Sequence, residues 1–302
     1  MRYGFIGLGN LGKHLAASLL RSGLDLTVHD LNRAAANDLV ERGARWAHSP
    51  KELASAVDAV ITCLPSPVAS AAVLTADNGV LNGLRAGGTW IEMSTTDQSE
   101  IERISRLAAA RGIATLEAPV TGGVHRAAAG EITVLVGGER AVYETHRTAL
   151  QAMGGEIFYM GELGKACIIK VITNMLAFIH LVAAGEALML AKRGGLDLAQ
   201  AFAAIKASSG TSFVHETESQ LILNGSYNIN FTMDLACKDL GFAHGFGREF
   251  GVPLELAGLT EQIFRRAREQ YGGSAQSTQV VKLLEDALHT DLRAAGFPAE
   301  LS

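Results

Sequence analysis

The first half of the chain alternates short, almost wholly apolar runs with longer stretches in which apolar residues recur every three or four positions. The short runs indicate buried strands, and the longer stretches indicate helices with one apolar face. The predicted strands cover residues 2–7, 24–30, 59–64, 89–92, 113–117, 132–136 and 156–160. Because helices separate the strands, the pattern predicts βαβ units and therefore a mostly parallel sheet.

The pattern changes near Gly161. A single apolar stretch of helical character runs from Gly164 to about Arg193, where Gly194 and Gly195 end it. Further helices are predicted at 197–206, 213–223, 233–250, 254–271 and 280–294, with no strand after residue 160. We therefore expect an α/β Rossmann-type domain at residues 1–163 and an all-α domain at 164–302, joined by the long helix.

Composition narrows the class of protein. The formal net charge is −5 and no basic tract or acidic tail is present, which argues against a nucleic-acid partner. Cys63, Cys167 and Cys237 are far apart, which argues against a disulfide framework or structural zinc and fits a reducing cytoplasm. The long apolar stretch contains Lys170 and Glu186, which are costly in hydrocarbon. We expect a cytoplasmic protein without a membrane span.

A glycine-rich loop follows the first predicted strand and opens the first helix. Its sequence is Gly7-Leu8-Gly9-Asn10-Leu11-Gly12. Glycines at this spacing permit a tight turn and a close approach of the backbone to a pyrophosphate, which the start of the helix attracts. The surrounding strand and helix make this a dinucleotide-binding fingerprint rather than a purely structural turn.

Asp30 lies at the end of the second predicted strand, 18 positions after Gly12. A carboxylate there accepts the ribose hydroxyls and repels a 2′-phosphate, so the sequence favours NAD over NADP. Arg33 is an argument for NADP if its side chain binds this phosphate, and is neutral if it is a solvated residue of the helix.

The loops Leu64-Pro65-Ser66-Pro67 and Ser94-Thr95-Thr96-Asp97 follow two further strands, at the sheet edge where such ligands bind.

Two segments are candidates for the chemistry. Lys170 and Asn174 are one turn apart in the apolar helix, and burying an ammonium group costs several kcal/mol unless it is used or paired. The alternative is a lysine that extends to the domain edge. Thr121, Gly122 and Gly123 follow another strand, where backbone N–H groups would suit a small carboxylate, unless this is an ordinary loop.

Together these motifs resemble the 3-hydroxyisobutyrate dehydrogenase (β-hydroxyacid dehydrogenase) family over nearly the whole chain. The matching segments are residues 7–12, 94–95, 118–123, 161–174 and 238–240. The resemblance implies that Lys170 is the catalytic lysine, that Asn174 helps to hold the substrate, and that the loop at Thr121, Gly122 and Gly123 binds its carboxylate. It also implies cofactor contacts from Leu64, Pro65, Thr95 and Lys238. Thr121 stands where the family usually has serine.

The predicted activity is reversible hydride transfer between NAD and the hydroxyl-bearing carbon of a small hydroxy acid, with Lys170 as general acid and base. The alternatives are an imine reductase-like enzyme and a non-catalytic dinucleotide-binding protein on the same fold. Lys170 argues against both alternatives. The substrate stays open among 3-hydroxyisobutyrate-like, tartronate semialdehyde- or glycerate-like and 4-hydroxybutyrate-like acids. The apolar helices predict a homodimer or homotetramer.

Overall fold

The structure is a computed structural model in which residues 1–301 are described. The chain divides into two compact units, Met1–Lys170 and the part from Val171 onward. The predicted architecture, a Rossmann-type α/β unit followed by a helical unit with a long helix joining them, is confirmed. The division falls within that long helix, α8 (Lys165–Arg193).

A nine-stranded sheet forms the core of the first unit. The strands run in the spatial order β3-β2-β1-β4-β5-β6-β8-β7, and β9 pairs with β8. Strands β1 to β6 are parallel, whereas β8 runs antiparallel to β6. Their bounds are β1 Arg2–Ile6, β2 Asp25–His29, β3 Arg45–Trp46, β4 Ala59–Thr62, β5 Thr89–Glu92, β6 Ala114–Glu117, β7 Val120–Thr121, β8 Ile132–Gly138 and β9 Gly154–Gly161.

The register of the parallel strands aligns their carboxyl ends. Ile6 pairs with His29 on one side and with Thr62 on the other, Thr62 pairs with Glu92, and Glu92 pairs with Glu117. The strand order reverses at β1, which is the switch point where doubly wound sheets bind nucleotides. The loops that follow these five strands therefore lie along one edge of the sheet.

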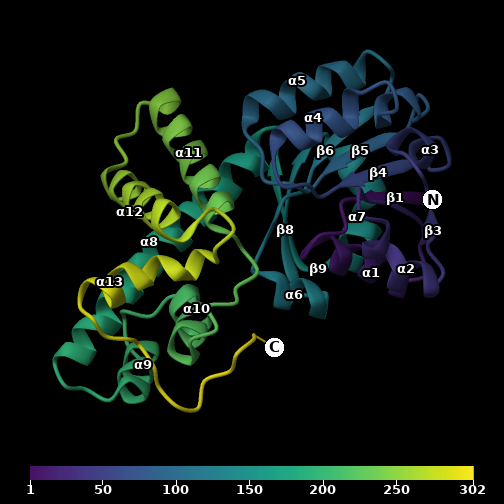
Figure 1. Cartoon of the computed structure of the whole chain (residues 1–302). Coiled ribbons are helices and arrows are strands. Elements are labelled where there is room, and N and C mark those ends of the chain that lie inside the picture. The colour runs from purple at the N-terminus through teal and green to yellow at the C-terminus, as the bar shows by residue number, and fades with distance from the viewer. Residues whose placement is uncertain (302) are drawn as a thin grey trace. The chain divides into compact units, whose positions relative to one another are not determined.

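Helices cover both faces of this sheet (Figure 1). One core cluster packs Leu15, Leu19 and Leu150 of α1 and α7 against the strands, and a second packs Leu53, Leu74 and Ile104 of α3, α4 and α5. Trp90 of β5 is fully buried in the second cluster, and its indole nitrogen donates to the hydroxyl of Thr62 at 2.8 Å. The helices are α1 Gly12–Arg21, α2 Asn37–Glu41, α3 Pro50–Ser55, α4 Pro67–Thr75, α5 Gln98–Ala109, α6 Val124–Ala129 and α7 Arg140–Met153, with short 3-10 helices η1 Arg33–Ala36 and η2 Val80–Asn82.

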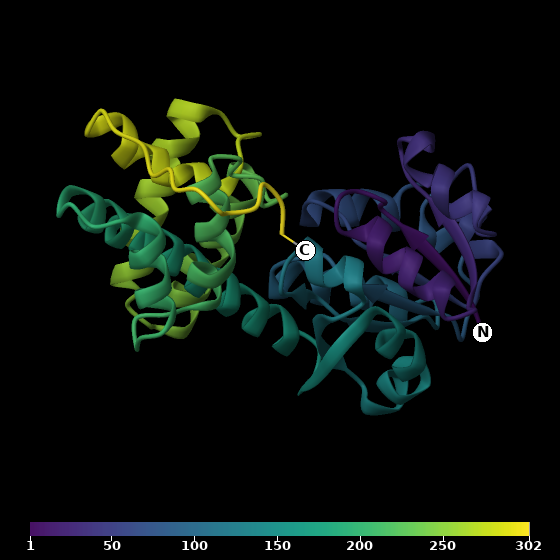
Figure 2. The same ribbon diagram turned by 90° about the horizontal axis from the view of Figure 1, so that it is seen from below.

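The second unit consists of helices (Figure 2). They pack around a separate core that includes Phe178, Leu223, Leu240 and Phe264. After α8 come α9 Leu198–Lys206, α10 Phe213–Asn224, α11 Met233–Phe250, α12 Glu255–Tyr271, η3 Ser277–Val281 and α13 Lys282–Ala287. The helix predicted at 280–294 is wrong at its end. Buried Glu285 accepts from the backbone N–H of Leu292 and from Arg293, which holds the chain in a return after α13 instead of a further helical turn.

Helix α8 is long and apolar enough to cross a membrane by length and composition alone. Of its most apolar 18-residue window, 39% is buried inside the structure. The sequence predicts a buried helix, and the structure leaves part of it exposed: Leu176 and Ile172 are 43% and 39% accessible. The buried positions include Lys170 and Asn174.

Candidate active site

The glycine loop after β1 has the geometry that a dinucleotide requires. Gly7 has φ +99°, and a Cβ there would collide with the carbonyl oxygen of Cys63. A Cβ on Gly12 would collide with the carbonyl oxygen of Gly7, so the helix start can approach the strand only without a side chain. A Cβ on Gly9 meets nothing within 4 Å. The backbone at Gly9 is thus open to a ligand, and the loop fits a pyrophosphate.

Asp30 lies directly beside this loop. Its Oδ2 accepts from the backbone N–H of Leu8 at 2.7 Å, and its Oδ1 accepts from Asn32 at 2.8 Å. A carboxylate has about four lone-pair sites, so both oxygens retain acceptor capacity for ribose hydroxyls. The guanidinium of Arg33 lies 4.6 Å from the ring centroid of Trp46 and donates to Asn37 at 3.2 Å. Arg33 is thus occupied by contacts within the first unit.

The loops after β4 and β5 are joined to each other. The backbone N–H of Leu64 donates to the hydroxyl of Ser94 at 2.7 Å, and the backbone N–H of Ser94 donates to Glu92 at 2.8 Å. Glu92 is 1% exposed, and burial raises the pKa of its carboxyl group. This link fixes the positions of Pro65 and Thr95, the two neighbouring residues predicted to contact the cofactor.

The glycine loop after β7 has an unusual backbone geometry. Gly122 and Gly123 have φ values of +122° and +89°, which side chains other than hydrogen rarely allow. Thr121 ends the two-residue strand β7, where it pairs with Thr133 of β8. Both glycines are therefore required by the path of the chain itself, whatever binds there.

Lys170 is 8% exposed and lies one turn after the first residues of α8. The start of α8 is attached to the sheet by Glu117, the last residue of β6. Its carboxylate accepts from the backbone N–H groups of Ala166 at 2.8 Å and Cys167 at 3.1 Å. Burial raises the pKa of Glu117 to about 7. Because Ala166 and Lys170 are four residues apart, Glu117 fixes the turn that precedes the lysine.

In the second unit, Asn174 belongs to a buried polar group that the sequence only partly indicated. Its Nδ2 donates to Asp239 at 2.6 Å, and Nζ of Lys238 pairs with the other oxygen of Asp239 at 2.7 Å. Asp239 is 1% exposed. The structure thus brings the predicted residues Asn174 and Lys238 onto one carboxylate. The sequence contained a signal for Asp239, the Lys238-Asp239-Leu240 motif, but not its role as the bridge.

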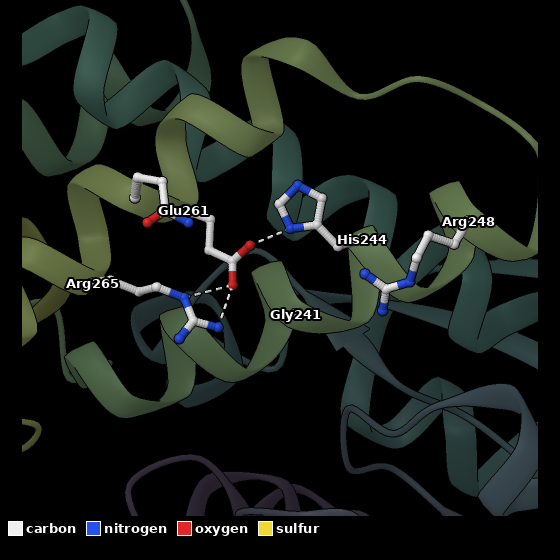
Figure 3. A pocket seen from close by; sticks show the side chains of 6 residues that line it. Gly241, His244, Arg248, Glu261 and Arg265 are labelled. Carbon is white, nitrogen blue, oxygen red and sulfur yellow. Dashed lines mark hydrogen bonds and ion pairs between the residues drawn. The ribbon is translucent and has the colours of Figure 1, made fainter.

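A charged cluster in the hollow between α11 and α12 was missed altogether (Figure 3). Glu261, 6% exposed, pairs with His244 and accepts from Nε and Nη2 of Arg265 at 2.8 and 2.6 Å. The pair of His244 and Glu261 joins the two helices, whereas Glu261 and Arg265 lie one turn apart on α12. Among the described residues, no group of three or more His, Cys, Asp or Glu side chains could hold a metal ion.

Comparison with known proteins agrees with this architecture. Residues 2–161 match the model of the NAD binding domain of 6-phosphogluconate dehydrogenase, and residues 164–284 match that of the NAD-binding domain of NADP-dependent 3-hydroxyisobutyrate dehydrogenase. The chain is 33% identical to 2-(hydroxymethyl)glutarate dehydrogenase of Eubacterium barkeri, over 94% of this chain and 95% of that protein. It is 32% identical to L-threonate dehydrogenase of Cupriavidus necator, over 93% and 95% of the two chains.

Among solved structures, 3-hydroxyisobutyrate dehydrogenase from Salmonella typhimurium superimposes with a TM-score of 0.88 at 30% identity, covering 94% of this chain and 99% of that one. One family model matches the α/β unit and the other matches most of the helical unit. The curated relatives align with both units. The chain therefore belongs to the 3-hydroxyisobutyrate dehydrogenase family of NAD(P)-dependent hydroxy-acid dehydrogenases.

Proposed function

We propose that this chain oxidises a small hydroxy acid, and reduces the corresponding semialdehyde or ketone, with NAD as the preferred cofactor and Lys170 as general acid and base. The observation that carries the proposal is the burial of Lys170, 8% exposed on an apolar helix whose first turn is held at the carboxyl edge of the sheet. Burying an ammonium group carries a cost in free energy, and buried ionisable groups of this kind are concentrated at functional sites.

Each candidate site residue has a proposed role that follows from its position. The loop of Gly7, Gly9 and Gly12 holds the pyrophosphate, Asp30 the ribose hydroxyls, and Leu64, Pro65, Thr95 and Lys238 further parts of the cofactor. When bound, the nicotinamide ring supplies the hydride acceptor or donor. Nζ of Lys170 takes the proton of the substrate hydroxyl in oxidation and returns it in reduction. Asn174 orients the substrate, and the loop at Thr121, Gly122 and Gly123 binds its carboxylate.

Support for NAD comes from the first unit. The Asp30 carboxylate would meet a 2′-phosphate with like charge, and Arg33 is stacked on Trp46. The family model of the second half is named for an NADP-dependent enzyme, so both cofactors belong in the assay.

The candidate substrates follow the relatives: 2-(hydroxymethyl)glutarate, L-threonate and 3-hydroxyisobutyrate, with glycerate and 4-hydroxybutyrate as further members of the class. All are small acids with a hydroxyl group separated from a carboxylate by a short carbon chain. The experiment is a screen of purified protein for reduction of NAD and NADP with each acid. An imine reductase-like enzyme would reduce cyclic imines instead, and a binding protein would take up NADH without turnover.

Lys170→Ala provides the decisive test of mechanism. General acid–base groups contribute about 10²- to 10⁴-fold to rate, so kcat should fall by that factor while NADH affinity and the thermal midpoint stay near those of the parent. Lys170→Arg should also be slow, because arginine stays protonated. Lys165→Ala, at an exposed position of the same helix, is the matched control. Parent-like kcat in Lys170→Ala would overturn the assignment.

A further inference from the structure

Two basic side chains adjoin the glycine loop that the proposed function assigns to the substrate carboxylate. A Cβ built on Gly122 would lie 3.1 Å from Cδ and 3.7 Å from Nη1 of Arg126. A Cβ built on Gly123 would lie 3.0 Å from both Nδ1 and Cε1 of the His125 ring. The side chains of Arg126 and His125 therefore lie directly against the backbone of the two glycines, one on each.

The guanidinium of Arg126 has no anionic partner of its own. Within residues 1–301 it forms no ion pair or hydrogen bond, although the residue is half-buried. By contrast, the arginines at positions 2, 42, 45, 85 and 103 of the same unit all pair with a carboxylate. A half-buried guanidinium next to a ligand-binding loop is well suited to an incoming anion, since its planar fork matches a carboxylate.

His125 differs from Arg126 in charge. Burial, and then the neighbouring Arg126, lower the pKa of His125 below its usual value. The lowered pKa favours the neutral, hydrogen-bonding form of the imidazole, whereas Arg126 supplies the fixed positive charge. The pair offers one cation and one polar neighbour in addition to the loop itself.

The backbone N–H groups of the loop of Thr121, Gly122 and Gly123 suit one carboxylate by themselves. The guanidinium of Arg126 is then available to a second anionic group of the same substrate. Resting on the proposed function, we infer that Arg126, assisted by His125, binds a second carboxylate, so that the substrate class is a dicarboxylic hydroxy acid. 3-Hydroxyisobutyrate, which lacks this group, would be a poor substrate.

The first experiment compares kcat/KM for 2-(hydroxymethyl)glutarate and 3-hydroxyisobutyrate in the parent, Arg126→Gln and Arg126→Lys. A charge-assisted hydrogen bond to a carboxylate is worth about 10- to 100-fold, so Arg126→Gln should lower the dicarboxylate-to-monocarboxylate ratio by about that factor. Arg126→Lys should recover part of it. Arg147→Gln, an exposed arginine of α7, is the control and should leave the ratio unchanged. Equal losses on both acids would mean that Arg126 holds the carboxylate common to them, and an unchanged ratio would mean that it holds neither; both results overturn the inference.

The second experiment separates this inference from the proposed activity. Titration calorimetry with glutarate and with isobutyrate, in the presence of NADH, measures binding without turnover. We expect glutarate to bind more tightly than isobutyrate in the parent, and at least tenfold more weakly in Arg126→Gln than in the parent. If no acid is oxidised but this dependence on Arg126 is found, the proposed activity fails and the second-carboxylate site stands. If turnover is found and glutarate binding does not depend on Arg126, the proposed activity stands and the second-carboxylate site fails.

Discussion

At the residue scale, the buried carboxylate of Asp239 determines how Asn174 is presented. Because Nδ2 of Asn174 donates to Asp239, the amide is turned with its oxygen away from that carboxylate. Lys238 compensates the charge of Asp239, which would otherwise be costly at 1% exposure. Asp239 therefore holds in place both Asn174, which is proposed to orient the substrate, and Lys238, which is proposed to contact the cofactor.

Asp239→Asn should expose this dependence. The amide cannot accept from both neighbours as a carboxylate does, and breaking a buried hydrogen-bonded charge costs about 1–3 kcal/mol. We expect kcat to fall about 10- to 100-fold and the KM for the cofactor to rise, with a modest drop in thermal midpoint. Steady-state kinetics with both substrates varied measures the two effects. Asp234→Asn, an exposed carboxylate at the start of the same helix, should behave like the parent; if the two variants behave alike, Asp239 has no positioning role.

Asp30 governs the expected choice between NAD and NADP. In Asp30→Ala the repulsion of a 2′-phosphate is removed together with the acceptor for the ribose hydroxyls, so the ratio of kcat/KM for NAD over NADP should fall by about tenfold or more. Asp25→Ala, at the exposed start of the same strand, is the control. A parent enzyme that turns over NADP as well as NAD would contradict the preference and would point to Arg33 as a phosphate ligand.

At the element scale, the attachment of α8 to β6 sets the position of Lys170. Glu117 accepts from two N–H groups in the first turn of the helix, at a point where helix N–H groups have no partner within the helix. The residues involved are 49 and 50 positions apart in sequence, so no local pattern could predict the contact.

The titration of Glu117 makes this attachment testable. Burial raises its pKa from 4.5 to about 7, so the folded protein binds this proton more tightly than the unfolded chain. The resulting contribution, about 3 kcal/mol, is fully present below pH 4.5 and is lost as pH rises through about 7. The thermal midpoint of the parent should therefore fall between pH 5 and 8 more steeply than that of Glu117→Gln. Glu102→Gln, on the surface of α5, should follow the parent; parallel curves for Glu117→Gln and the parent would refute the titration.

Sequence patterns predicted most elements because burial alone determines them. The strands β1, β4 and β5 are apolar runs closed by turns, and α11 was predicted with its observed bounds. The two-residue strands β3 and β7 were missed because their pairing depends on neighbours remote in sequence. For the same reason the motifs led to Lys170 and Asn174, whereas the supports of these residues, Glu117 and Asp239, became evident only from their contacts.

At the scale of the whole molecule, exposed apolar side chains are concentrated in the helical unit. Among residues 1–301, ten large hydrophobic residues are exposed in the helical unit, against six in the longer first unit. Those of the helical unit are Ile172, Leu176, Leu190, Leu196, Phe213, Phe250, Val252, Leu256, Leu259 and Leu288. Exposed apolar side chains that gather into a patch mark interaction sites in many proteins. This distribution supports the predicted homodimer or homotetramer.

The assembly is tested by the mass of the protein in solution. Each chain has a mass of 31.8 kDa, and light scattering at micromolar concentration should give two or four times this value. Leu256 and Leu259 are 66% and 62% exposed one turn apart on α12, and burying a leucine contributes about 1.5–3 kcal/mol, so Leu256→Glu with Leu259→Glu should shift the mass toward that of the single chain. Leu31→Glu, a fully exposed position of the first unit, should leave the mass unchanged. A parent protein with the mass of one chain would refute the prediction, and an unaffected double variant would exclude this part of α12 from the interface.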